Sequence, residues 1–204
     1  MTLAEALGKI KAMGQPVFRT ADVMVVLDVQ KSYASKALKR LTQHGHVVRL
    51  MRGLWSLPES VDPLALVTHL TAPFPSYVSL QSALYYHNMI SQIPELIYGV
   101  SLGRTRTYKT SIAAVSIHHI KASFFFGYDE KGEQSVRMAL PEKALLDILY
   151  LSQTKSRLFA ALPEIEFPSQ FSIKRACKMI RKIKDLRRRS LVQSHLERLI
   201  NQKT

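Results

Sequence analysis

Short amphipathic patterns fill the N-terminal part of the chain. Thr2 and Glu5 have the spacing of a capping box, which starts a helix. The apolar positions that follow recur at helical spacing, at Leu3, Ala6, Leu7, Ile10 and Met13. Similar spacing predicts a second short helix capped by Thr20 and a third helix over residues 31–44, which ends before Gly45. We therefore expect three successive helices.

The pattern then changes to that of paired strands. Residues 46–50 and 54–57 are rich in β-branched, apolar and aromatic side chains, and the turn between them ends at Gly53. Two such runs around a tight turn predict a β-hairpin, with Arg49 and Arg52 on or near the turn. Three short helices followed by a hairpin is the order of a winged helix-turn-helix domain. We predict that domain for residues 1–60.

The third predicted helix has two different faces. At 100° per residue, one side carries Ala34, Leu38 and Leu41. The opposite side carries hydroxyls, an amide and long cations, at Ser32, Ser35, Lys36, Lys39 and Gln43. Such side chains enter the major groove of DNA without steric conflict, which favours DNA binding. The alternative is a winged helix that makes only protein contacts.

The candidate DNA contacts lie on the third helix and the hairpin. They are Lys31, Ser32, Tyr33, Ser35, Lys36, Lys39, Arg40, Arg49 and Arg52. We place Lys31 and Arg40 at phosphates and Arg52 in the minor groove or at the backbone. Tyr33 either donates its hydroxyl to a phosphate or covers the turn. Trp55 is expected in the core, because a hairpin buries one face.

The rest of the chain predicts an α+β domain over residues 61–204. Proline and polar residues mark a domain edge near residue 60. Helical patterns start at Asp62–Pro63, at Ser76 and at Pro141. Strands are expected at 97–102, 112–120, 122–127 and 134–139, with a basic turn at 103–110 between two of them. We expect a small, mostly antiparallel sheet with packed helices and a basic helical tail from about residue 170.

Composition and charge then narrow the class of protein. The chain has 204 residues, 47% of them apolar, and a formal charge of +14. One cysteine excludes a disulfide scaffold and a cysteine-based zinc site. The sequence shows neither a signal-peptide pattern nor an apolar run long enough to span a membrane, so we expect a cytoplasmic protein without a membrane partner.

The excess charge is confined to the two ends. Residues 1–60 carry nine basic and four acidic side chains, 61–173 carry nine of each, and 174–204 carry eleven basic and two acidic. Two basic ends around a neutral middle indicate two surfaces that face a polyanion. The alternative at the C-terminal end is the solvated face of an amphipathic helix.

Secondary phosphate contacts are predicted outside the first domain. The candidates are Arg104, Arg106, Lys174, Lys178, Arg181, Arg187, Arg188 and Arg189. Binding of an acidic toxin or of RNA by the tail is a competing interpretation. Cys177 lies among the apolar positions of the tail and is interpreted as a small buried hydrophobe.

No catalytic residue, metal site or cofactor is predicted, and we do not expect an enzyme. His118 and His119 are adjacent on an expected strand and therefore point to opposite faces, one packed and one exposed. Glu142 is interpreted as a first-turn acid that complements a helix dipole. The chain contains no phosphate-binding glycine motif and no nucleophile elbow. The acidic cluster around Gly132 is interpreted as a solvated loop: Asp129, Glu130 and Glu133.

Five short motifs occur in order in the second domain. They are YVSLQSALYYH at 77–87, Ile93-Pro94, Arg104-Thr105-Arg106, His118-His119-Ile120 and PEKALLD at 141–147. Their order and spacing resemble the AbiEi antitoxin family, the antitoxin-regulators of bacterial abortive-infection, type IV toxin–antitoxin systems. With the winged helix, the resemblance covers roughly residues 1–160.

The resemblance implies a function that spacing and composition do not. It implies an antitoxin that represses its own operon by binding double-stranded DNA at inverted repeats, in the bacterial cytoplasm and on the nucleoid when bound. It also implies an opposing nucleotidyltransferase-like toxin, antagonised without necessarily forming a complex. The alternative is an RNA- or protein-binding module that acts on a toxin or its RNA target without operator recognition.

Overall fold

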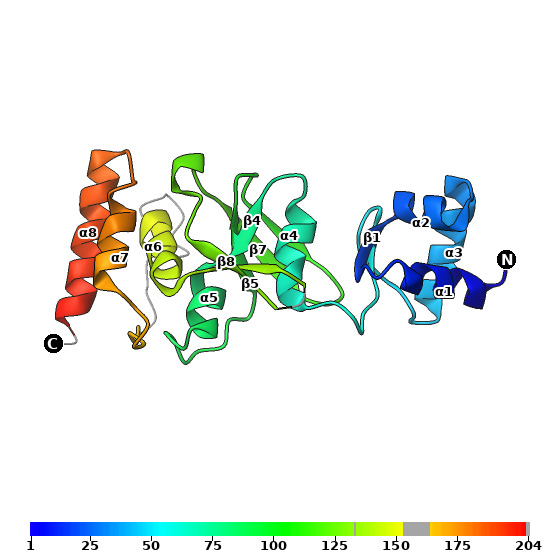
Figure 1. Cartoon of the computed structure of the whole chain (residues 1–204), viewed down its shortest axis with the longest axis horizontal. Helices are drawn as coiled ribbons and strands as arrows, with labels where there is room; N and C mark the ends of the chain where they lie inside the picture. The colour runs from blue at the N-terminus through cyan, green and yellow to red at the C-terminus, as the bar shows by residue number, and fades with distance from the viewer. Residues whose placement is uncertain (133, 153–163, 203–204) are drawn as a thin grey trace. The chain divides into compact units, whose positions relative to one another are not determined.

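The computed structural model describes residues 1–132, 134–152 and 164–202 (Figure 1). The chain separates into two compact units. The N-terminal unit contains residues 1–63 together with 109–114, and the C-terminal unit contains the described residues of 64–108 and 115–204. The separation thus falls three residues beyond the expected domain edge, and part of the expected basic turn groups with the N-terminal unit.

The N-terminal unit contains three helices and a small sheet. Its elements are α1 (Leu3–Ala12), β1 (Val17–Arg19), α2 (Thr20–Leu27), α3 (Lys31–Gln43), β2 (Val48–Met51) and β3 (Leu54–Ser56). The strands pair antiparallel in the order β1-β3-β2. The three expected helices and the expected hairpin are therefore present, with β1 added as a third strand.

Local capping sets where these helices begin and end. The predicted capping box is confirmed, since the Glu5 amide donates to Thr2 Oγ1 (3.2 Å) and the Thr2 amide donates to Glu5 Oε2 (2.8 Å). Asp28 adopts a left-handed conformation (φ 52°) that ends α2 and turns the chain toward α3. The apolar sides of the helices then close over one core: Ala6, Ile10, Phe18, Val23, Leu27, Ala34, Leu38, Leu41, Val47 and Leu57.

The C-terminal unit is an α+β structure around a six-stranded sheet. Its elements are η1 (Pro63–Ala65), α4 (Leu66–Thr71), β4 (Ser76–Val78), α5 (Leu80–Tyr86), β5 (Ile97–Ser101), β6 (Arg106–Lys109), β7 (Ala114–His119), η2 (Ala122–Phe124), β8 (Tyr128–Lys131), β9 (Val136–Ala139), α6 (Pro141–Ser152), α7 (Ile173–Ile180) and α8 (Leu186–Asn201). The strand order is β6-β7-β5-β4-β9-β8. No described helix is long and apolar enough to cross a membrane.

The expectation of a mostly antiparallel sheet is wrong, because the sheet is mixed. The pairs β4–β9 and β5–β7 are parallel, whereas β4–β5 and β8–β9 are antiparallel. Parallel neighbours require crossover connections. The segment that contains β6 connects β5 to β7, and the long stretch between residues 78 and 136 connects β4 to β9. Strand propensity along the chain does not specify which strands become neighbours.

Four expected elements differ from the structure. The segment from Ser76 begins as strand β4, and the helix starts only at Leu80. Residues 122–127 contain a short 3-10 helix instead of a strand. Strands β6 and β8 occupy segments that were expected to be a basic turn and an acidic loop. Strand β4 forms because it pairs with the distant strands β5 and β9, whereas β6 and β8 each pair with the strand that follows them along the chain. In these segments, strand pairing outweighs local preference.

Helix α6 is the centre of the C-terminal unit. Every residue from Pro141 to Leu151 is buried, including three charged side chains: Glu142, Lys143 and Asp147. Helix α6 packs against α5 and β9 on one side and against α7 and α8 on the other (Figure 1). The basic helices α7 and α8 are therefore docked on the domain as a layer.

Candidate nucleic-acid interface

A basic groove lies between α3 and the β2–β3 hairpin of the N-terminal unit. Its volume is about 930 Å³. Five cationic side chains line it: Arg19, Lys31, Lys39, Arg49 and Arg52. The remaining lining residues are uncharged and include Thr20, Ser35, Thr42, Gln43 and Trp55. We call this site the basic groove; its charge suits a polyanion such as a nucleic-acid backbone.

Helix α3 divides the predicted contact residues between two surfaces. Ala34, Leu38 and Leu41 face the core, as predicted, and Ala37 is buried with them. Three predicted contacts, Lys31, Ser35 and Lys39, line the basic groove. Ser32 and Lys36 are exposed but do not line it, because they follow the outward side of the helix. The helix thus presents a groove side and an outward side.

Tyr33 and Arg40 lie on the flank of α3 away from the basic groove. The Tyr33 hydroxyl donates to the backbone carbonyl oxygen of Met1 over 3.3 Å, and the ring lies against the start of α1. This contact favours the interpretation in which Tyr33 covers the turn. Arg40 is exposed.

The hairpin is held against α2 by backbone and side-chain hydrogen bonds. The Thr20 amide donates to the Gly53 carbonyl oxygen (3.1 Å), and Trp55 Nε1 donates to Thr20 Oγ1 (2.9 Å). Gly53 has φ 78°, a conformation that glycine adopts without strain. The Arg49 guanidinium carbon lies 5.8 Å from the Trp55 ring centroid, within range of a cation–π interaction. These contacts hold Arg49 and Arg52 beside the groove.

Several groove residues were not predicted as contacts from the sequence, among them Arg19, Thr20 and Trp55. Arg19 and Thr20 lie on β1 and at the start of α2, and Trp55 was expected in the core. Trp55 is only partly buried, with one part packed on the core and another lining the groove. The pairing of β1 with β3, which aligns Phe18 with Trp55, brings these segments together. The one feature of the sequence that could have indicated Arg19 as a contact is that it is a basic side chain directly before the start of α2.

Two acidic side chains of the N-terminal unit take part in helix caps. The Arg19 amide donates to Asp22 Oδ2 over 2.6 Å at the start of α2. Glu5 belongs to the capping box of α1 and lines a different pocket, together with Tyr33. Because no acidic side chain lines the groove, its cations are not neutralised locally.

The secondary phosphate candidates fall into two groups. Arg104, Arg106, Lys174, Lys178, Arg181 and Arg187 are exposed. By contrast, the Arg188 guanidinium lies 4.5 Å from the Tyr150 ring centroid, and Arg189 donates two hydrogen bonds to the Ile183 carbonyl oxygen (2.8 and 2.6 Å). The last two arginines therefore contribute first to packing of α8. Cys177 is partly rather than fully buried, which corrects its interpretation.

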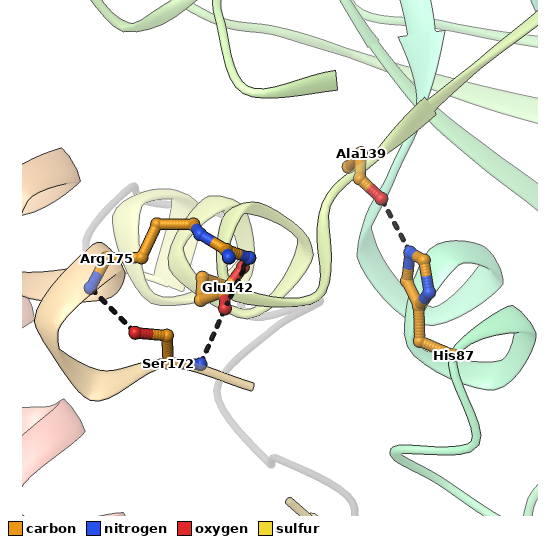
Figure 2. Close-up of polar contacts among 5 residues, drawn as sticks. All are labelled: His87, Ala139, Glu142, Ser172 and Arg175. Atoms are coloured by element: carbon orange, nitrogen blue, oxygen red, sulfur yellow. Dashed lines mark hydrogen bonds and ion pairs between the residues drawn. The ribbon is translucent and has the colours of Figure 1, made fainter. Parts of the chain in front are cut away.

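Figure 2 shows how the basic helices are attached. The buried Glu142 carboxylate accepts hydrogen bonds from the Ser172 amide (2.6 Å) and from Arg175 Nη1 (3.1 Å). Ser172 Oγ in turn accepts from the Arg175 amide (3.3 Å) as the cap of α7. Glu142 is in the first turn of α6, as predicted, but its carboxylate binds a distant segment.

The described residues that were considered for enzymatic chemistry do not come together in one site. His118 is buried and His119 is exposed, as predicted, and burial lowers the pKa of His118 to about 4. Asp129 and Glu130 are exposed on β8, and Glu133 lies outside the described residues. Among the residues that the structure describes, no three histidine, cysteine or acidic side chains are placed to hold a metal ion.

Comparisons with known proteins leave the family open. No protein-family model matches the chain, and no curated protein sequence matches it significantly.

Proposed function

We propose that the N-terminal unit is a winged helix-turn-helix domain that binds double-stranded DNA. The observation that carries this proposal is the basic groove, in which five cations and no acid lie between α3 and the hairpin. The element order and the antiparallel hairpin beside α3 also support it.

The two sides of α3 suggest different contacts with DNA. The cations of the groove side, Lys31 and Lys39, contact the phosphates of one strand together with Arg49 and Arg52. The outward side, with Ser32 and Lys36, enters the major groove and meets base edges.

We further propose that the chain is a bacterial, cytoplasmic transcriptional autorepressor and the antitoxin of a type IV toxin–antitoxin system. It binds inverted repeats upstream of its operon and opposes a nucleotidyltransferase-like toxin. This part of the proposal rests on the resemblance of the motifs between residues 77 and 147 to the AbiEi family, because the basic groove supports DNA binding alone.

An electrophoretic shift assay on the DNA directly upstream of the gene tests the repressor function. We expect a sequence-preferring shift, and the variant Lys36→Ala/Lys39→Ala should bind roughly tenfold or more weakly. Lys11→Ala is the matched control, since Lys11 is an exposed cation on α1 outside the basic groove. If the double variant bound the DNA with unchanged affinity, α3 would not be the element that recognises DNA.

A rescue assay tests the antitoxin function separately. If a nucleotidyltransferase-like gene lies directly downstream, as the proposal expects, it is induced with and without this chain and growth is measured. Rescue by the Lys36→Ala/Lys39→Ala variant would show that antitoxin activity does not need DNA binding. Co-purification of RNA without any operator shift would favour the RNA-binding alternative.

A further inference from the structure

A second groove lies on the C-terminal unit. It is formed by α5, the loop that follows it and the start of β5, and its volume is about 680 Å³. Tyr85, Tyr86, Ile90, Ile93 and Pro94 supply much of its apolar lining. We call it the tyrosine groove.

The tyrosine groove exposes large apolar side chains to water. Ile93 is 70% exposed, Tyr86 49% and Tyr85 41%. Three such side chains around one concave surface form a patch that is costly to leave in water, and patches of this kind mark binding sites. Tyrosine is also enriched where proteins meet partners, because its ring is apolar and its hydroxyl remains solvated.

The groove is preformed. The Tyr98 amide donates to Ser82 Oγ (2.8 Å), and the Glu166 amide donates to the Met89 carbonyl oxygen (2.8 Å). At the end of α5, His87 Nε2 lies 2.7 Å from the Ala139 carbonyl oxygen, which ties the helix to the end of β9 (Figure 2). A rigid groove loses little conformational freedom when it is filled, which favours binding.

Charge decides what kind of partner fits. Between residues 64 and 103 the sequence contains no lysine or arginine and one acidic residue, Glu95. Among the residues that the structure describes, the charged residue that lines the groove is Glu166. The described lining of the groove therefore carries negative charge, in a chain whose net charge is +14. Nucleic acid is disfavoured here, because its phosphates would approach carboxylates, and the described lining offers no cation to bind them.

We propose that the tyrosine groove docks a cationic, apolar segment of another polypeptide. Its apolar side chains fill the space between Tyr86 and Ile93, and its lysine or arginine side chains approach Glu95 and Glu166. This proposal does not rest on the basic groove, so the C-terminal unit would have a protein-binding surface whether or not the chain binds DNA.

Fluorescence anisotropy of the full-length protein with three labelled octapeptides tests the proposal. The first alternates arginine with leucine and phenylalanine, the second replaces each arginine by glutamate, and the third replaces each apolar residue by serine. We expect binding of the first peptide alone at the tyrosine groove. The basic ends of the chain repel this peptide, so its binding reports on the acidic, apolar surface.

Two surface variants locate the binding. Ile93→Ser should weaken the arginine–apolar peptide about tenfold, and Glu166→Lys should weaken it further at low salt. Leu186→Ser is the matched control, since Leu186 is also 70% exposed but lies on α8 outside the groove. The operator shift of Ile93→Ser should equal that of the unaltered protein, which separates this site from the proposed DNA function.

Four results would overturn the proposal. They are absence of binding by the arginine–apolar peptide, equal binding of the glutamate peptide at the groove, and equal loss in Ile93→Ser and Leu186→Ser. The fourth is a changed readout other than peptide binding in a groove variant. Weaker binding of a single-stranded oligonucleotide would make nucleic acid the occupant, and a lower molecular mass in sedimentation would make a second copy of the chain the occupant.

Discussion

Asp147 is a fully buried carboxylate that three side chains contact. Tyr77 and Ser79 donate to its Oδ2 over 3.0 and 2.7 Å, and Lys143 pairs with its Oδ1. The Lys143 ammonium also lies 3.9 Å from the Phe124 ring centroid. Burial lowers the pKa of Lys143 and raises that of Asp147, while the attraction between the two groups opposes both changes. The polar groups satisfy one another in a site closed to water.

Removing one partner of this pair should therefore be strongly destabilising. We expect Asp147→Asn to lower the free energy of unfolding by about 3–5 kcal/mol, because Lys143 keeps a buried charge without a counterion. Urea unfolding followed by circular dichroism measures the free energy of unfolding of both proteins. Glu130→Gln is the control, since its ion pair with Arg137 is exposed and is worth under about 1 kcal/mol. Equal losses in both variants would contradict this account.

His118 makes stability depend on pH. Its folded pKa is about 4 and its ordinary value is 6.5, because the folded environment disfavours the charged ring. As the pH falls, His118 therefore binds a proton in the unfolded chain before it does so in the folded chain. The free energy of unfolding decreases as the pH falls from 6.5 toward 4. We expect this loss to be about 2 kcal/mol, at about 1.4 kcal/mol per pH unit with allowance for residual solvation.

Urea unfolding at pH 7 and pH 4.5 measures the contribution of His118. The variant His118→Gln should lose less stability between these two conditions than the unaltered protein. An identical loss in both proteins would assign the pH dependence to other groups.

At the scale of elements, Glu142 is the connection that holds α7 to α6. Glu142→Ala leaves the Ser172 amide and Arg175 without their buried acceptor, which costs about 1.5–3 kcal/mol. We expect amide exchange in α7 and α8 to accelerate by roughly tenfold or more, with α6 less affected. Hydrogen–deuterium exchange with mass spectrometry measures this.

Glu197→Ala is the matched control for that experiment, because Glu197 is an exposed acid on α8 that contacts only its own helix in the contacts described. Unchanged exchange in Glu142→Ala would mean that apolar packing alone holds the two helices.

Elements defined by local patterns could be predicted from the sequence, whereas elements defined by distant pairing could not. Helix α3 follows from the spacing of Ala34, Leu38 and Leu41, which is a property of neighbouring residues. Strand β4 exists because Ser76–Val78 pairs with β5 and β9, more than twenty residues away. For the same reason the cations of α3 were predicted, but the contribution of Trp55 to the basic groove was not.

At the scale of the whole molecule, charge separates three kinds of surface. The basic groove carries the cations of the N-terminal unit, and α7 with the start of α8 carries exposed cations of the C-terminal unit. The one charged side chain in the described lining of the tyrosine groove is that of Glu166, which is acidic. A net charge of +14 therefore describes no single surface of this protein.

This distribution predicts the salt dependence of DNA binding. If about six phosphates are neutralised, the logarithm of affinity should fall against the logarithm of salt concentration with a slope of roughly −5. Titrations of the operator at several salt concentrations measure it. Arg49→Ala/Arg52→Ala should make the slope less steep by about 2, and Lys11→Ala should leave it unchanged. A slope near zero would contradict binding through the phosphate backbone.

The lack of lysine and arginine between residues 53 and 103 also determines how this part of the tyrosine groove can be mapped chemically. No lysine occurs between Lys39 and Lys109, and trypsin has no cleavage site between Arg52 and Arg104. Amine-reactive cross-linkers would therefore not report a partner bound there, and the whole region would appear as one long tryptic peptide. Carbodiimide coupling to Glu95 and Glu166, followed by pepsin digestion, would make this surface visible.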